Sequence, residues 1–559
     1  MIRTTKLAAF AVASALVAAG STESSAQQPL PLKHSGQPTV PAITAADAMT
    51  RLYIFADDSM KGREAGTEGE RKGTTYIERE LRRLGLTPGG ENGTFFQAVP
   101  LYTRVVDFTS KLSADATPLV AGEDYFPIHP GGRPIPLEGV QVIYVGNTAD
   151  TTSLAPRASA AGKAVVFTGP VSAVARRYPD AAAYMVVRPD GTMSQIRAYV
   201  RSTTQGMKQP GDTLRTRYTV FIPASAAQKF IGVPLENARP GTVGRTFRGR
   251  IDYTVNNLPA RNVVAIIPGS DPNLRNQYVA FGAHSDHEGV RRQGGLDHDS
   301  LRAFNKAAAK IVLARTGELP DFPGTGITPD ERATIRLNLD SIRAGRPARL
   351  DSIFNGADDD GSGSVGLLEI AEKFARASVK PKRSLLFVWH TAEEAGLYGA
   401  EWFTDFPTVP RDSIVVQLNI DMIGRGEAGD IPNGGPDYVQ LLGSRRLSTE
   451  FGNLIETVNK LPAHKFRLDY TYDASGHPDQ YYCRSDHYNY ARYGIPIVFM
   501  STGGHADYHQ LTDEPQYISY PKIAKVASLL ADVGERVANM DRRLVIDKPK
   551  PDPKGSCIQ

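Results

Sequence analysis

Cysteine is scarce in this sequence: its 559 residues contain only Cys483 and Cys557. Two cysteines cannot supply the framework of several disulfides that stabilises small secreted proteins. They also cannot supply a structural zinc site built from four thiolates. Because only Ile558 and Gln559 follow Cys557, the sequence leaves open whether the two cysteines pair.

Strong charge imbalance, phosphate-binding motifs and long apolar segments are missing as well. The formal net charge is only +4, which gives no sign of a nucleic-acid-binding surface. No glycine-rich motif ends in Lys-Ser or Lys-Thr. Beyond the N-terminal region, no stretch reaches about 18 uninterrupted apolar residues. We therefore expect no nucleic-acid partner and no membrane segment in the mature chain, while the oligomeric state cannot be read from the sequence.

The first 26 residues have the features of a cleaved signal peptide. Arg3 and Lys6 precede the apolar run "LAAFAVASALVAAG", which is short for a membrane span. Small residues in "SSA" then provide a cleavage site before Gln27. A retained anchor is the alternative interpretation, whereas the absence of a following cysteine disfavours a lipid anchor. We expect a secreted or periplasmic protein.

The remaining chain is too long for a single hydrophobic core, and its character changes twice. Residues 27–104 include two stretches with helical spacing of apolar residues, and they join the later α/β part. Residues 105–255 contain short β-rich runs such as "GVQVIYVG" and "GKAVVFTG", separated by turn residues. This pattern predicts a separate β-rich insert. Residues 546–559 form a C-terminal tail.

Residues 256–545 alternate between apolar strands and amphipathic helices. Runs such as "YVAFGAH" and "RSLLFVWH" are apolar on both faces, which is typical of strands in a largely parallel sheet covered by helices. We predict an α/β fold with a mostly parallel central sheet. A charged, helix-prone interruption at residues 290–354 is read as a lid-like insertion at one edge of the sheet.

Potential metal ligands follow several of the predicted strands, where functional clefts of α/β sheets lie. They are His284, Asp286, Glu393, Glu394, Asp421, His505 and His509, and the loop "NGADDDGSGS" adds Asp358, Asp359 and Asp360. Each alone is more often an ordinary turn residue. The loop is also unlike a calcium loop, in which ligands alternate with spacers. Taken together, these oxygen and imidazole donors indicate a divalent-metal site. We place His287, His298, His390 and His505 outside it.

Five motifs, "AHSD", "GADDDGSG", "TAEEAGLYGA", "NIDMIG" and "DYHQLTDEP", resemble those of the dinuclear-zinc aminopeptidases, metallopeptidase family twenty-eight. Relatives in that family include glutamate carboxypeptidase, glutaminyl cyclase and the non-catalytic transferrin receptor. The resemblance covers residues 262–540 and implies a fold of the zinc-exopeptidase type. "MKGREAGTEG" resembles the N-terminal segment of the family. Residues 105–255 resemble the protease-associated domain that is often inserted there.

The resemblance implies two Zn²⁺ ions per chain. One ion would bind His284, Asp421 and one oxygen of Asp359, and the other would bind Glu394, His509 and the second oxygen of Asp359. It also implies a cis peptide bond between Asp359 and Asp360, which is rare outside proline.

Adjacent residues of a turn or helix face different ways, so Glu393 and Glu394 can divide their roles. Glu394 would bind metal while Glu393 acts as general base and then general acid on the metal-activated water. Asp286 fits a carboxylate that fixes the tautomer of His284. Either Tyr482 or Tyr508 would stabilise the oxyanion.

We therefore expect a zinc-dependent exopeptidase with peptide substrates, and favour an aminopeptidase. A carboxypeptidase or dipeptidase of the same fold remains an alternative, because the motif residues do not separate these activities. The hypothesis from a different functional class is a non-catalytic, receptor-like binding protein. It predicts lost ligands, whereas all five ligands and the base are present. The preferred residue and peptide length cannot be read from the sequence.

Overall fold

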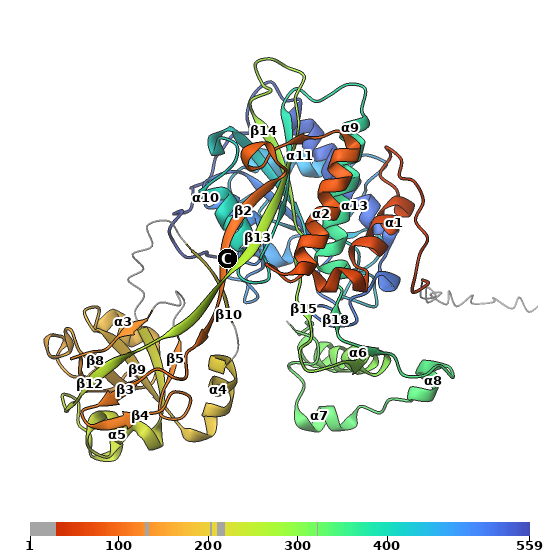
Figure 1. The fold of residues 1–559 in the computed structure, drawn as a ribbon. Helices are drawn as coiled ribbons and strands as arrows, with labels where there is room; N and C mark the ends of the chain where they lie inside the picture. Colours follow the sequence, from red (N-terminus) through yellow and green to blue (C-terminus); the bar gives the residue numbers. More distant parts are fainter. Residues whose placement is uncertain (1–29, 129–133, 202–203, 209–217, 321) are drawn as a thin grey trace, which may run out of the picture.

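The computed structural model describes residues 30–128, 134–201, 204–208, 218–320 and 322–559. The proposed signal peptide therefore lies outside the described residues. Figure 1 shows an upper α/β domain, with a β-rich domain and a smaller helical lobe below it on opposite sides. Within the described ranges, no helix combines the length and the apolar character needed to cross a membrane.

The α/β domain is built on a ten-stranded sheet, ordered β10-β2-β13-β19-β14-β20-β23-β21-β22, with β1 paired to β13. Its strands are β1 (Thr87–Pro88), β2 (Phe96–Val106), β10 (Thr204–Met207), β13 (Tyr253–Ile267), β14 (Tyr278–His284), β19 (Ser384–His390), β20 (Ile414–Ile420), β21 (Tyr438–Leu442), β22 (Arg467–Asp469) and β23 (Ile497–Ser501). The four central strands, β19, β14, β20 and β23, are parallel. On one side β13, β2 and β10 join antiparallel, and on the other β21 joins antiparallel while the edge strand β22 is parallel to β21. The predicted α/β fold is confirmed, and its sheet is mixed.

Helices cover both faces of this sheet because its central strands are buried on both sides. One layer contains α1 (Ala45–Phe55), α2 (Glu68–Leu84), α9 (Gly363–Arg376), α11 (Thr449–Asn459) and α13 (Tyr520–Ala538). The other contains α10 (Tyr398–Asp405) and α12 (His487–Ala491). The N-terminal segment thus belongs to the α/β domain: Arg51 of α1 is buried and forms ion pairs with Glu369 and Glu372 of α9.

The β-rich domain has a nine-stranded sheet and a hydrophobic core of its own. Its strands are β3 (Leu112–Ala114), β4 (Thr117–Leu119), β5 (Phe126–Ile128), β6 (Ile135–Pro136), β7 (Gln141–Asn147), β8 (Ala164–Thr168), β9 (Ala183–Arg188), β11 (Tyr218–Pro223) and β12 (Val243–Ile251). The helices of this region are α3 (Val171–Arg177), α4 (Met193–Arg201) and α5 (Ala227–Ile231). The connection to the α/β domain is the β2–β13 ribbon, in which all 11 residues of β2 pair with β13 (Figure 1).

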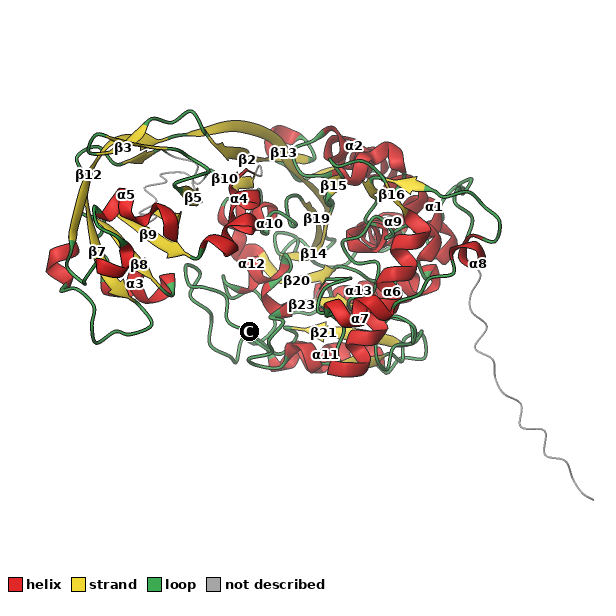
Figure 2. Cartoon of the chain, turned by 90° about the horizontal axis from the view of Figure 1, so that it is seen from below, coloured by secondary structure: helices red, strands yellow, loops and turns green. Residues whose placement is uncertain are grey.

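The interruption at residues 290–354 forms the helical lobe. Its neck is a pair of two-residue strands, β15 (Gly289–Val290) and β18 (Ile353–Phe354), and a second pair joins β16 (Leu296–Asp297) to β17 (Leu350–Asp351). The helices are α6 (His298–Thr316), α7 (Pro329–Thr334) and α8 (Leu339–Arg343). Figure 2, seen from below, shows α6 and α7 in front of the α/β domain.

The two cysteines, whose pairing the sequence left open, form a disulfide between Cys483 and Cys557. Further contacts hold the C-terminal tail: the side-chain oxygen of Gln559 accepts a hydrogen bond of 2.9 Å from the backbone N–H of Tyr482. The tail is therefore fastened to the segment that precedes α12.

Candidate metal centre

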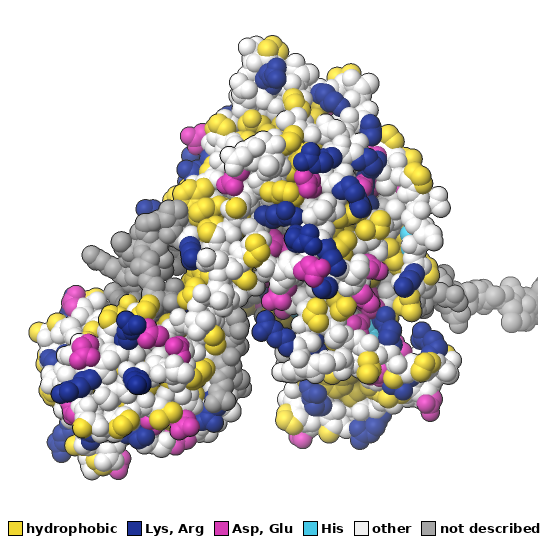
Figure 3. Space-filling view, viewed as in Figure 1, with side chains coloured by type: hydrophobic (Ala, Val, Ile, Leu, Met, Phe, Trp, Pro, Cys, Tyr) yellow, Lys and Arg dark blue, Asp and Glu magenta, His cyan; other side chains and the backbone are white. Residues whose placement is uncertain are grey.

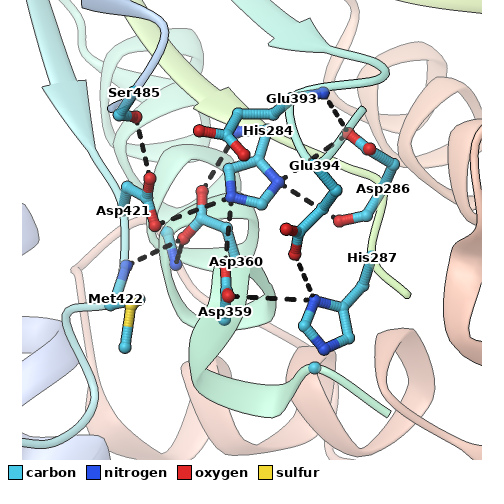
Figure 4. A network of polar contacts seen from close by, with 12 residues as sticks. His284, Asp286, His287, Asp359, Asp360, Glu393, Glu394, Asp421, Met422 and Ser485 are labelled. Carbon is cyan, nitrogen blue, oxygen red and sulfur yellow. Dashed lines mark hydrogen bonds and ion pairs between the residues drawn. The ribbon is translucent and has the colours of Figure 1, made fainter. Parts of the chain in front are cut away.

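Four predicted donors reach one point because of the strand order. His284 is the last residue of β14, Glu393 and Glu394 follow the end of β19, and Asp421 comes directly after β20. These three strands are parallel neighbours, so their carboxyl ends lie together at one edge of the sheet. Figure 4 shows the side chains converging there.

Asp359 lies at the middle of the cluster. Its Oδ1 is 3.1 Å from Nε2 of His284, and its Oδ2 is 2.9 Å from Nε2 of His509. Asp513 holds the loop, since its carboxylate accepts hydrogen bonds from the backbone N–H groups of Asp358 and Asp359. The expected cis peptide bond between Asp359 and Asp360 is present. One carboxylate thus connects two sets of donors.

The two sets share only Asp359. On one side, Oδ1 of Asp421 is 3.6 Å from Nε2 of His284, while its Oδ2 accepts a hydrogen bond from Ser485. On the other side, Oε2 of Glu394 is 3.0 Å from Nε2 of His509. All five predicted metal ligands are therefore brought together.

His287 also belongs to this cluster, although the sequence reading placed it outside. Its Nδ1 is 2.6 Å from Oε1 of Glu394, and the side chain is fully buried (Figure 4). The available signal was its position in "AHSDH", three residues after His284 in the turn that follows β14. The other three histidines set aside lie apart from the cluster, with His505 against Asp358, His390 against Asp486 and His298 against Glu514.

The donors fit a divalent cation. Among the residues that the structure describes, Nε2 of His284 and Oδ2 of Asp359 are buried without a hydrogen-bond partner, although they lie 3.1 Å from Oδ1 of Asp359 and 2.9 Å from Nε2 of His509, respectively. Such atoms are costly to bury unless a cation satisfies them. Burial alone would raise the pKa of Glu394, but His509 and His287 outweigh it and hold the pKa at about 2. Imidazole and ionised carboxylate together suit zinc.

Glu393 and Glu394 face different spaces, as the sequence predicted for adjacent residues. Glu393 lines a cleft together with Asp421, Tyr508 and His509, while Glu394 lines a second cavity on the other side of the cluster. Burial, reinforced by the charges of Asp421 and Glu394, raises the pKa of Glu393 well above its usual range. An acid in such a setting is a typical proton carrier.

Asp286 contacts His284 as expected, but its backbone carbonyl lies closer to the imidazole than its carboxylate does. Its backbone carbonyl lies 3.2 Å from Nδ1 of His284, whereas its carboxylate Oδ1 is 3.8 Å from the same nitrogen. That carboxylate accepts a hydrogen bond of 3.1 Å from the backbone N–H of Glu393. Asp286 therefore ties the turn after β14 to the turn after β19.

The structure separates the two candidate tyrosines. Tyr508 lines the cleft, its ring lies 4.0 Å from that of His509, and its hydroxyl accepts a hydrogen bond from Arg484. Tyr482 instead packs in the apolar core beneath the sheet, with the Arg446 guanidinium 4.0 Å above its ring. Its neighbour Tyr481 lines the cleft. Among the predicted tyrosines, only Tyr508 is within this site.

The cleft is lined by apolar side chains of the α/β domain and by residues of the helical lobe. Met422, Ile431 and Phe499 line the cleft from the α/β domain, and Glu318, Leu319 and Pro320 line it from the lobe. Phe322 of the lobe stacks on Tyr508 at a centroid distance of 5.9 Å. The lobe therefore borders the cleft.

Comparison with known families gives one match: residues 331–534 match the model of peptidase family M28. Among curated proteins, the chain is 40% identical over 85 residues to leupeptin-inactivating enzyme 1 of Streptomyces exfoliatus, covering 15% of this chain and 19% of that protein. It is 30% identical over 225 residues to leucine aminopeptidase 1 of Coccidioides posadasii, covering 38% of this chain and 51% of that protein. The chain thus spans about a fifth and about half of these relatives.

Among solved structures, an aminopeptidase from Aneurinibacillus sp. strain AM-1 is similar, with 17% identity and a TM-score of 0.47 over 91% of this chain and 97% of that one. A zinc aminopeptidase from Bacillus subtilis gives 15% identity and a TM-score of 0.43, covering 89% of this chain and 95% of that chain.

Proposed function

We propose that the protein is a zinc-dependent aminopeptidase with peptide substrates, because residues 331–534 match the model of peptidase family M28. The observation that carries the proposal is Asp359, whose two carboxylate oxygens lie within 3.1 Å of ring nitrogens from two separate donor sets. The names of the curated relatives support the aminopeptidase over the carboxypeptidase or dipeptidase alternative.

We propose that two Zn²⁺ ions bind per chain. His284, Asp421 and Asp359 would hold one ion, and Glu394, His509 and Asp359 would hold the other. His287 would fix the orientation of Glu394 through the 2.6 Å contact between Nδ1 and Oε1. Orientation of this kind is what neighbours of a metal ligand usually supply.

The protein's own residues then have distinct tasks. When bound, the zinc ions polarise the scissile carbonyl and lower the pKa of the attacking water. Glu393 takes the proton of that water and returns it to the leaving amine. Tyr508, on the wall of the cleft, would donate a hydrogen bond from its hydroxyl to the developing oxyanion. The Asp286 carboxylate keeps Glu393 in place by accepting a hydrogen bond from its backbone N–H.

Two further parts of the proposal concern access and location. Leu319 and Pro320 of the lobe would act as a lid that shapes side-chain preference. We also propose that the protein is exported, secreted or periplasmic, on the basis of its N-terminal sequence.

Substitutions of the two glutamates test the proposal. Glu393→Gln keeps the shape but cannot carry a proton, so zinc content should stay at two per chain while kcat falls by roughly 10²–10⁴. Glu394→Gln removes an anionic ligand, so one zinc should be lost and added zinc should partly restore activity. Glu535→Gln, on the exposed face of α13, is the matched control and should change neither.

Zinc would be measured by elemental analysis, and activity with leucine p-nitroanilide, free peptides and N-acetylated peptides. Loss of zinc from Glu393→Gln with full retention in Glu394→Gln would mean that the roles are exchanged. Cleavage of N-acetylated but not free peptides would refute the aminopeptidase assignment. Unchanged activity and zinc in both variants would place the active site elsewhere.

A further inference from the structure

A second cavity lies on the opposite side of the metal centre from the cleft. Its volume is about 480 Å³, within the range of roughly 300–1,000 Å³ that is typical of ligand sites. Asp286, His287 and Glu394 form the wall toward the metal centre, and Arg104 and Gln205 come from strands β2 and β10. These strands and the segment before β15 flank the open recess between the β-rich domain and the lobe in Figure 3.

The acidic side chains that line this cavity already have partners. Glu64 lies 3.9 Å from Arg292, and Glu288 lies 3.3 Å from Nδ1 of His509. Glu394 and Asp286 belong to the metal centre described above. Each acidic side chain of this wall therefore either has a cationic neighbour or belongs to the metal centre.

Arg104 differs from these acids. Within the described parts of the chain, its guanidinium makes no ion pair, and its Nη1 is buried without a hydrogen-bond partner. Oε1 of Gln205, on the paired strand β10, is also buried and without a partner there. A buried guanidinium nitrogen with no acceptor is costly, and a carboxylate is the acceptor that matches its planar, forked geometry.

The charges on the two sides of the metal centre are complementary to the two ends of a peptide. Glu318 and Asp479 line the same cleft as Glu393, and their carboxylates would attract the amino terminus of a peptide. Arg104 lines the same cavity as Glu394, and its guanidinium would attract the carboxylate of a peptide. A peptide with a free amine and a free carboxylate would thus be oriented with its first residue in the cleft.

We propose that Arg104 binds the C-terminal carboxylate of short peptide substrates, so that the enzyme acts preferentially on peptides with two or three residues. This inference rests on the proposed aminopeptidase function and names the substrate class of the same site. The strand β2 that carries Arg104 leads directly into the β-rich domain, so the domain junction supplies the specificity.

The test compares Leu-Gly, Leu-Gly-Gly, their C-terminal amides and leucine p-nitroanilide, using the zinc-loaded full chain. Wild type should prefer each free peptide to its amide. Arg104→Met should lower kcat/KM for the free peptides by roughly 10- to 100-fold, mainly through KM, and should leave the amides and the p-nitroanilide unchanged. Arg104→Lys should retain part of the preference, because it keeps the charge and loses the fork. Arg248→Met, exposed on β12, is the matched control.

Two results would overturn the inference while leaving the proposed function intact. One is a wild type that cleaves free and amidated peptides equally well. The other is an Arg104→Met variant that loses activity on all substrates by the same factor, which would indicate a structural role. Absence of hydrolysis with every substrate, the p-nitroanilide included, would instead refute the aminopeptidase itself.

Discussion

The loop that carries Tyr508 and His509 depends on one buried carboxylate, and neutralising that carboxylate should be costly. Asp507 is fully buried and accepts hydrogen bonds from Nε of Arg302, at 3.1 Å, and from Nη1 of Arg425, at 3.0 Å. Thr512 donates a third, at 2.7 Å. Burial opposes ionisation of Asp507, but Arg425 and Arg302 outweigh it and hold its pKa well below the usual range. Arg302 lies on α6, so the lobe itself supports the loop.

The expected loss of stability in Asp507→Asn depends on how buried its two arginine partners are. Removing one partner of a buried ion pair destabilises a protein by about 3–5 kcal/mol. Arg425 is 4% exposed and keeps Asp430 at 2.6 Å, and Arg302 is 19% exposed, so part of the charge remains compensated. We expect Asp507→Asn to lower the unfolding free energy by about 3 kcal/mol. Arg302→Met should cost about 1–2 kcal/mol, because Asp507 keeps two donors.

Urea unfolding of the zinc-loaded protein, with zinc content and kinetics on leucine p-nitroanilide, would measure these effects. Displacement of His509 should also reduce kcat/KM on the order of tenfold to a hundredfold. Asp541→Asn is the control, since Asp541 is 90% exposed and pairs with Lys382 at the surface. An Asp507→Asn variant that matches the control in unfolding free energy and kinetics would refute this account of the loop.

Two other predictions concern the lid and acid stability. Replacing Glu318, Leu319 and Pro320 by glycine should change the ranking of substrates by N-terminal residue, with zinc content unchanged; an identical ranking would exclude a lid. Burial opposes ionisation of Glu514, but His298 and Arg349 outweigh it and lower its pKa from 4.5 to about 2. The contribution of Glu514 to the unfolding free energy is therefore complete above pH 4.5 and is lost as the pH falls toward 2. Glu514→Gln should lower the unfolding free energy by about 3 kcal/mol at pH 7 and by less than half as much at about pH 3; a constant difference in urea titrations would contradict this.

The sequence predicts the metal centre better than its surroundings, for a physical reason. His284, Glu394 and Asp421 each follow an apolar strand, and parallel strands place such residues at one edge whatever their order in the sheet. The strand order itself depends on long-range pairing that no local pattern encodes. This is why the antiparallel pairing of β13 with β19 and of β21 with β23 was not expected.

Features that were missed depend on single-residue geometry or on distant contacts. A short 3₁₀ turn at residues 481–483 directs Tyr481 to the cleft and Tyr482 to the core, and the sequence "YYC" does not distinguish them. His287 gains its role only because Glu394, 107 positions away in the sequence, lies against it. The disulfide likewise joins residues 74 positions apart.

The β2–β13 ribbon makes the β-rich domain a removable module. Because the two strands are antiparallel partners, the chain leaves and re-enters the α/β domain at adjacent points, such as Leu101 opposite Leu258. Paired residues of this kind are only about 4.5–5.5 Å apart, so a tight hairpin turn can close the gap without a linker. Excision at that level would take Arg104 away with the module. Exchange of such a module between related proteins would therefore replace Arg104, to which we assign the preference for short peptides. The residues of the metal centre would stay the same.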